Sequence, residues 1–315
     1  MNQEQIDKSI DVACGFDEYL SKSGKKLENA SYEDLYCFSD ILIKNGTNTV
    51  DRYVALFRLG NFLKNNELII ASLEVIDGSE MIENFYNRLG VEFGQHVRDE
   101  VFDGIGIPPL GIRPEAKPEF TKKLVERFLA KFDNDTCKAF FEAGLRDKYT
   151  ASYVGPKQMY EELDDIDKFL ISKHQKLVST LKKHSQEKTL FFTQEVDDDV
   201  VSYVGDRVTI EGGIREGNRV TITKIPYMTR QFLDANNEKK KRHFFCHNPW
   251  IRYALREEDQ PVDPVFCGCS AGYFKNFWEA IFEQPVRVEV IKSVIKGDEI
   301  CEFVLHLPPG IVDEE

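Results

Sequence analysis

The spacing of the hydrophobic residues changes near residue 188, and this change constrains the fold more than any other feature of the chain. Before it, apolar residues recur at helical spacing. The clearest helical stripe comprises Ile166, Phe169, Leu170, Leu177 and Leu181. After residue 188, short β-rich and alternating runs follow one another between glycines. The sequence therefore predicts an α+β protein with a mostly α-helical part at 1–186 and an α+β domain with an antiparallel sheet at 187–315.

The first part also carries signals for where helices begin and end. Residues 31–44 have helical apolar spacing, and Asn45-Gly46 predicts the end of that helix. Asp77 with Glu80 resembles a capping box that starts the next helix. Residues 105–111 contain two adjacent prolines, which cannot continue a helix, so they predict a rigid connector.

The second part is predicted to contain six strands and an aromatic-rich helix at 271–282. The predicted strands are 189–193, 207–210, 219–223, 243–246, 285–291 and 300–306. Gly212-Gly213 and Gly217 predict the turns that join 207–210 to 219–223, because glycine supplies positive φ in hairpins. The basic run 239–242 is interpreted as a solvated loop entering a strand rather than a phosphate-binding patch.

Charge and composition exclude several classes of function. The chain has 315 residues and a formal net charge of −13, so a polyanion such as nucleic acid is repelled. No apolar run approaches the length that spans a bilayer, which predicts no membrane partner. The polar, acidic N-terminus is unlike a signal peptide, and seven cysteines without a secretory signal indicate reduced thiols in the cytoplasm.

Cysteines gather near the end of the chain and predict a site there. Cys246-His247 and Cys267-Gly268-Cys269 provide four soft donors, which is the number that tetrahedral zinc takes. Free cysteines are also among the most buried residues, so packed thiols are an equally good interpretation. The residues alone leave both open.

A nucleophilic thiol is a further interpretation of the same cluster. Cys269 lies at the start of a predicted helix, where the helix dipole stabilises a thiolate. His243, His247 or His306 could serve as the base, and Glu279 or Asp298 could orient it. A packed or metal-bound thiol remains the alternative.

Aromatic side chains near the cysteines predict the wall of a small-molecule pocket. The candidate pocket residues are Trp250, Tyr253, Tyr273, Phe277 and Trp278. A plain hydrophobic core at helical spacing is the alternative.

The last third of the chain resembles a known group of domains. Its order is Cys246 after a strand, Cys267 before a helix, and then Ser293 followed by Gly297-Asp298-x-x-Cys301 between two strands. This pattern is similar to the L-2-amino-thiazoline-4-carboxylic acid hydrolase-like family and to the 4-vinyl reductase ligand-sensing domains. The whole chain also resembles a bacterial protein family that implies no function.

The resemblance implies a metal site and a ligand. Vinyl-reductase-type sensors carry a structural zinc site, which implies Cys267 or Cys269 and Cys301 as zinc ligands here. Ser293 stands where a further cysteine ligand is expected, and Cys246 or His247 could substitute for it. Such domains hold apolar ligands, so the resemblance implies a small-molecule ligand in the aromatic pocket.

Three functions follow as hypotheses. The first is a small-molecule-binding protein with a Cys-rich site that zinc would stabilise. The second is a cysteine- or metal-dependent hydrolase of a C–N bond in a small, cyclic, amino-acid-derived substrate. The third is a scaffold whose helical part binds a protein. The sequence alone does not decide whether the protein is an enzyme.

Overall fold

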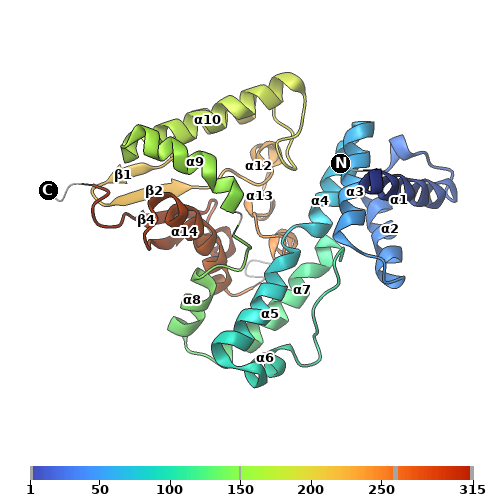
Figure 1. Ribbon diagram of the computed structural model, residues 1–315, viewed down its shortest axis with the longest axis horizontal. Coiled ribbons are helices and arrows are strands. Elements are labelled where there is room, and N and C mark those ends of the chain that lie inside the picture. The colour runs from blue at the N-terminus through green and yellow to red at the C-terminus, as the bar shows by residue number, and fades with distance from the viewer. Residues whose placement is uncertain (1–2, 149, 258–261, 313–315) are drawn as a thin grey trace.

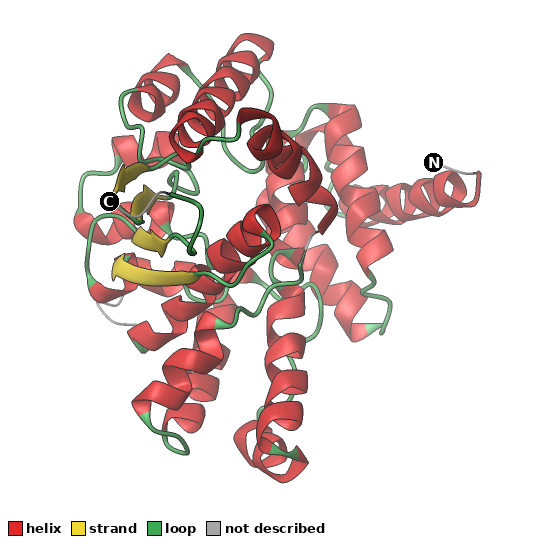
Figure 2. Ribbon diagram, turned by 60° about the vertical axis from the view of Figure 1, so that its left-hand side comes forward, coloured by secondary structure: helices red, strands yellow, loops and turns green. Residues whose placement is uncertain are grey.

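The computed structural model describes residues 3–148, 150–257 and 262–312, and it has the predicted α+β architecture. Figure 1 shows helices α1 to α4 at the end of the molecule opposite to the sheet, and Figure 2 shows the strands gathered among helices. None of the helices in these three segments is long and apolar enough to cross a membrane.

The first ten α-helices precede the sheet in the sequence. Their bounds are α1 Gln3–Ser21, α2 Tyr32–Lys44, α3 Val50–Leu63, α4 Asn66–Ile76, α5 Ser79–Phe93, α6 Gln95–Phe102, α7 Lys117–Leu129, α8 Asn134–Glu142, α9 Thr150–Leu163 and α10 Ile166–Glu187. Two short 3₁₀ helices, η1 Leu27–Asn29 and η2 Pro114–Ala116, lie between them. The predicted helix at 31–44 is confirmed, with a capping box between Ser31 and Asp34 at its start.

The remaining elements surround a four-stranded sheet. They are α11 Asp198–Gly205, β1 Ile214–Glu216, β2 Arg219–Thr223, α12 Thr229–Asp234, α13 Glu238–Phe245, η3 Arg252–Arg256, η4 Pro264–Cys267, α14 Gly268–Phe282, β3 Arg287–Lys292, η5 Val294–Lys296 and β4 Glu302–His306. The strand order is β1-β2-β4-β3, and every neighbouring pair is antiparallel.

The register of the sheet explains its single apolar face. Val220 pairs with Leu305, and Ile222 pairs with Phe303, so these four side chains point to the same side. Helix α14 and the start of α10 cover that side in a shared core with the strands. The aromatic-rich helix predicted at 271–282 is therefore confirmed and begins earlier, at Gly268.

Three strand predictions are wrong. Residues 189–193 form a turn closed by a bridge between Phe191 and Gln194, and 207–210 form turns of which only Ile210 makes an isolated bridge. The strand that pairs with 219–223 across the Gly217 turn is instead Ile214–Glu216. Short apolar runs do not distinguish strands from turns that tertiary packing fixes.

The third wrong strand prediction, 243–246, covers the end of α13 and its C-cap Cys246, and the basic run 239–242 lies in this helix rather than in a loop. Asn237 caps α13 because its side chain accepts a hydrogen bond from the Lys240 amide. Lysine and arginine have good helix propensity, so they continue the helix from this cap.

The capping prediction at Asp77 is also wrong. Gly78 is the N-cap of α5 with φ +66°, and Asp77 ends α4. The Asp77 and Glu80 carboxylates both pair with Arg146 instead, at 2.9 and 3.4 Å.

Hydrophobic cores join the two predicted parts of the chain. One core contains residues of α5 to α8 together with residues between Phe232 and Ile295. A second contains Ile166, Phe169 and Leu170 with the sheet. The N-terminal helices have a core of their own around Phe16, Leu35 and Tyr53. The packing between α5–α8 and the C-terminal loops builds the candidate site.

Candidate functional site

Two neighbouring loops carry residues of the candidate site. Residues 224–228 follow β2, and residues 246–248 follow α13. Backbone hydrogen bonds from Tyr227 to Phe245 and from Met228 to Phe244, at 3.3 and 2.9 Å, hold the loops side by side. The structure thereby brings Lys224 to the cysteines, although 21 residues or more separate them in the sequence.

Four cysteines, here called the thiol quartet, lie in or near these loops: Cys246, Cys267, Cys269 and Cys301. Cys269 lies in the first turn of α14, and Cys301 lies immediately before β4. Electrostatic interactions link Cys267 to each of the other three members. The structure therefore gathers the cysteines that the sequence singled out.

The thiols of the quartet are neutral at physiological pH. Burial raises the pKa of Cys269 to about 11 and that of Cys301 to about 12, and it raises the pKa of Cys246 and Cys267 as well. The Cys267 and Ser293 side chains are hydrogen-bonded at 2.9 Å, and Asn248 Nδ2 donates to Cys269 Sγ at 3.5 Å. Desolvation disfavours the thiolates, because each would be a buried anion.

The described side chains do not form a ready-made group of zinc ligands. All five candidate ligands lie in the described segments, and within those segments no group of three His, Cys, Asp or Glu side chains could hold a metal ion. His247 Nε2 is 2.6 Å from the Ile225 carbonyl oxygen, and Cys267 is engaged with Ser293. Zinc thus remains a prediction from the resemblance.

Lys224 is a buried cation beside the quartet. It is 9% exposed, and its Nζ lies 5.5 to 5.8 Å from the ring centroids of Tyr273, Phe274 and Phe303. In the described part of the chain, no carboxylate lies within ion-pair distance of this ammonium group. Its charge acts on Cys246, Cys269, Cys301 and His247.

Arg252 is a second buried cation, and its hydrogen bonding is incomplete. It is 1% exposed and stacks over the Tyr227 ring at 3.8 Å. Its Nη2 donates to Glu74 at 3.1 Å, whereas its Nε and Nη1 are buried without an acceptor in the described structure. Unpaired buried donors are rare in proteins, so they call for an explanation.

Glu74 of α4 is the acceptor that fixes Arg252. Its carboxylate is 2% exposed and also accepts hydrogen bonds from Tyr36 at 2.7 Å and from Tyr253 at 3.1 Å. One carboxylate therefore ties α2, α4 and η3 together. The sequence analysis missed this residue. A lone acidic residue in the apolar run Leu68–Ile76 is the signal that could have revealed it.

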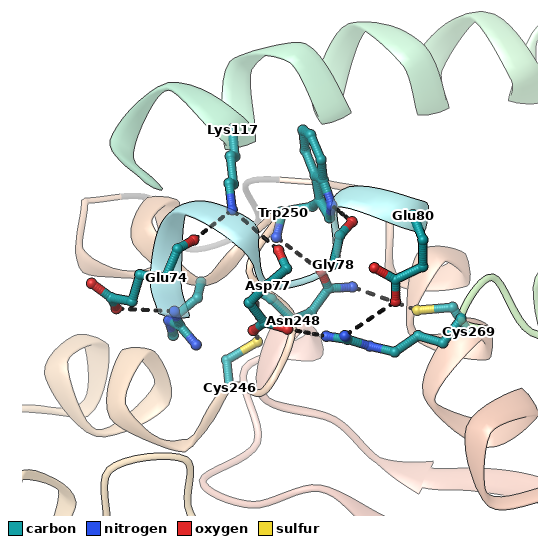
Figure 3. A network of polar contacts seen from close by, with 11 residues as sticks. Glu74, Asp77, Gly78, Glu80, Lys117, Cys246, Asn248, Trp250 and Cys269 are labelled. Carbon is teal, nitrogen blue, oxygen red and sulfur yellow. Dashed lines mark hydrogen bonds and ion pairs between the residues drawn. The ribbon is translucent and has the colours of Figure 1, made fainter. Parts of the chain in front are cut away.

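A wider polar network continues from Glu74 towards the thiols (Figure 3). Lys117 Nζ donates to the carbonyls of Glu74 and Asp77 at 2.8 and 3.2 Å, and burial lowers its pKa to about 8. Trp250 Nε1 donates to the Gly78 carbonyl at 2.6 Å. Figure 3 shows Asn248 between Cys246 and Cys269, at the side of the network that meets the quartet.

The candidate catalytic residues do not form a triad in this structure. Burial lowers the pKa of His247 to about 3, so its ring is neutral. No hydrogen bond joins Cys269 to His247 within the described residues. Asp298 accepts a hydrogen bond from the Ser293 amide at 2.8 Å, which fixes the turn after β3.

The candidate pocket residues occupy different places. Trp250 and Trp278 are buried in two separate hydrophobic cores, and Phe277 is half-buried beside Trp278. Tyr273 is exposed and is one of the rings near Lys224. Tyr253 lines a surface groove of about 440 Å³. The shared aromatic pocket stays a prediction.

No family model, curated protein or solved structure matches the chain. The function is therefore inferred from the site itself.

Proposed function

We propose that this protein binds a small organic monoanion, of the carboxylate class, at Lys224 and Arg252 beside the thiol quartet. One observation carries the proposal: the buried guanidinium of Arg252 has unused hydrogen-bonding capacity, and Lys224 lies in the same region, since both cations act electrostatically on Cys246 and His247. Arg252 has two buried nitrogens without an acceptor, and Lys224 has only aromatic rings as charge partners in the described structure. An anion would satisfy both.

The ion pairs around the site leave Lys224 without a carboxylate partner in the described structure. Arg146 pairs with Asp77 and Glu80, and Arg252 pairs with Glu74. A carboxylate group on the ligand would supply the missing partner of Lys224.

The neutral thiols favour the binding of an anion, because they leave the charge of Lys224 available to it. As neutral groups they do not neutralise Lys224, and their polarisable sulfur atoms suit an apolar part of a ligand. The resemblance to ligand-sensing domains points in the same direction. Binding is supported better than hydrolysis, because Cys269 has no base in hydrogen-bonding contact among the described residues.

Calorimetric titration of the protein with propionate at constant ionic strength tests the proposal, with chloride as the reference salt. Wild-type protein is expected to bind one propionate per chain and to unfold at a higher temperature with it. Lys224→Met keeps an unbranched side chain among the rings, and it should weaken binding at least about tenfold.

Lys292→Met is the matched control, because Lys292 lies on β3 with its side chain 47% exposed and pairs with Glu302. It should bind propionate as the wild type does. Absence of saturable binding by the wild type would refute the proposal, and so would equal binding by folded Lys224→Met protein.

A further inference from the structure

A groove of about 920 Å³ lies on the surface between α13 and the end of η3. Residues of the basic run 239–242 line its first wall, which α13 provides. Two hydrogen bonds join this wall to η3. His243 Nδ1 lies 2.8 Å from the Arg252 carbonyl oxygen, and Lys239 Nζ donates to the Glu257 carbonyl at 3.0 Å. The groove is thus a formed hollow, and its volume is within the range of small-molecule sites.

Two cations of the groove have no ionic partner. Lys240 comes from α13 and Arg256 from η3, so they belong to different walls. Among the described residues, no carboxylate lies within ion-pair distance of either side chain. The Arg256 guanidinium lies 5.1 Å from the centroid of the Tyr253 ring, which helps to hold it in place. An anion with two negative charges could pair with both cations, and a phosphate group carries about 1.5 to 2 at neutral pH.

The carboxylates that line the groove do not neutralise these two cations. Asp234 pairs with Arg230 at 2.6 Å, and Glu238 pairs with Lys241 at 3.5 Å. Neither of these basic partners is among the described lining residues, whereas Glu257 is the remaining lining carboxylate. The groove therefore concentrates positive charge in a chain whose net charge is −13, and it would attract an anion.

Amide side chains form another part of the lining, and they are Gln231, Asn236 and Asn237. An amide both donates and accepts hydrogen bonds, as the hydroxyl groups of a sugar also do. Gln231 Oε1 is buried without a donor in the described structure, so this amide can make one more hydrogen bond. The lining thus combines two unpaired cations with neutral groups that suit hydroxyls.

We infer that this groove binds a phosphorylated sugar, with the phosphate group between Lys240 and Arg256 and the sugar hydroxyls at the amides. Neither Lys224 nor Arg252 is among the described lining residues, so the groove is distinct from the proposed anion site. The inference goes beyond the proposed function and does not depend on it.

Three compounds that each carry one or both of the required groups test the inference. They are glucose 6-phosphate, inorganic phosphate and glucose, titrated calorimetrically at pH 7.5 and constant ionic strength. Wild-type protein is expected to bind one glucose 6-phosphate per chain. Inorganic phosphate should bind at least about tenfold more weakly, because it lacks the hydroxyls that bond to the amides. Glucose, which lacks the charge, should show no measurable binding.

Two variants assign the binding to the groove. Lys240→Met and Arg256→Met should each weaken the binding of glucose 6-phosphate at least about tenfold, because each removes a charged hydrogen-bond donor. Both side chains are exposed, so both variants are expected to fold. Lys182→Met is the matched control, because Lys182 is an exposed lysine on α10, and it should bind as the wild type does.

Each contrary result overturns the inference. Absence of saturable binding of glucose 6-phosphate by the wild type would refute it. Glucose or inorganic phosphate binding as tightly as glucose 6-phosphate would show that the ligand class is wrong. Unchanged binding by both Lys240→Met and Arg256→Met would place the ligand elsewhere on the chain, the anion site at Lys224 included. The titration of the wild type with propionate tests that anion site separately.

Discussion

Replacing Glu74 with glutamine should destabilise the protein strongly. The change removes the negative charge and retains the size of the side chain, so Arg252 stays buried without an ionic partner. Glu74 and Arg252 are 2% and 1% exposed, so water cannot replace the lost charge. Breaking a buried pair from one side costs about 3–5 kcal/mol of unfolding free energy. The tyrosine hydrogen bonds at 2.7 and 3.1 Å also lose their charged acceptor.

Urea unfolding followed by circular dichroism measures this loss. The double variant Glu74→Gln with Arg252→Met removes the stranded charge as well, so it should be more stable than the sum of the single variants predicts, by at least about 2 kcal/mol. Glu83→Gln is the control on an exposed face of α5, and it should change stability by less than about 0.5 kcal/mol. A Glu74→Gln loss below about 1 kcal/mol, or strict additivity of the two changes, would contradict the reasoning.

Three further predictions concern protons, thiols and packing. Burial lowers the pKa of His243 and His247 to about 3, so the unfolded chain binds protons at these two groups at a higher pH than the folded chain does. Their full contribution to stability is present well above pH 6.5, and the free energy of unfolding should be lower by roughly 3 kcal/mol at pH 5.5 than at pH 7.5 in acid-unfolding experiments. Equal stability at pH 5.5 and pH 7.5 would contradict this. At pH 7.5 a thiol reagent should label the exposed Cys14 quickly and the thiol quartet only after unfolding. A fast-reacting quartet thiol would contradict this, because it would show that an ionised cysteine compensates the positive charge of Lys224. Gly272→Ala should destabilise the protein by more than about 2 kcal/mol, because the new Cβ would lie 2.4 Å from the backbone of Gly144. Gly15→Ala is the control in α1, where the new Cβ meets open space, and it should stabilise the protein by about 0.5–1 kcal/mol. Equal effects of the two variants in thermal unfolding would argue against the close contact at Gly272.

The long helices could be predicted from the sequence because their signals are local. The stripe from Ile166 to Leu181 is enough to place α10, and glycine with asparagine is enough to place the turn between β1 and β2. The run 243–246 has the pattern of a strand, because its aromatic residues have high β propensity. The cap at Asn237 makes it helical instead, which shows that a capping signal can outweigh a short apolar run.

The candidate site could be predicted only in part. The cysteine cluster could be predicted because four cysteines follow Phe245 in the sequence. The sequence suggests Lys224 and Arg252 as polar contacts near the aromatic residues, but nothing near them in the sequence predicts that they are buried. Their burial results from packing between segments that are far apart in the chain, such as α4 with η3, which Glu74 and Arg252 join across 178 positions. Local periodicity carries no information about such contacts.

A crystal structure of the protein grown with propionate tests the central claim most directly. The account predicts one propionate per chain, with a carboxylate oxygen within hydrogen-bonding distance of Lys224 Nζ and of Arg252 Nη1. Density for propionate only elsewhere on the chain would contradict it, as would a crystal at saturating propionate in which a cysteine thiolate or a metal ion occupies the position beside Lys224.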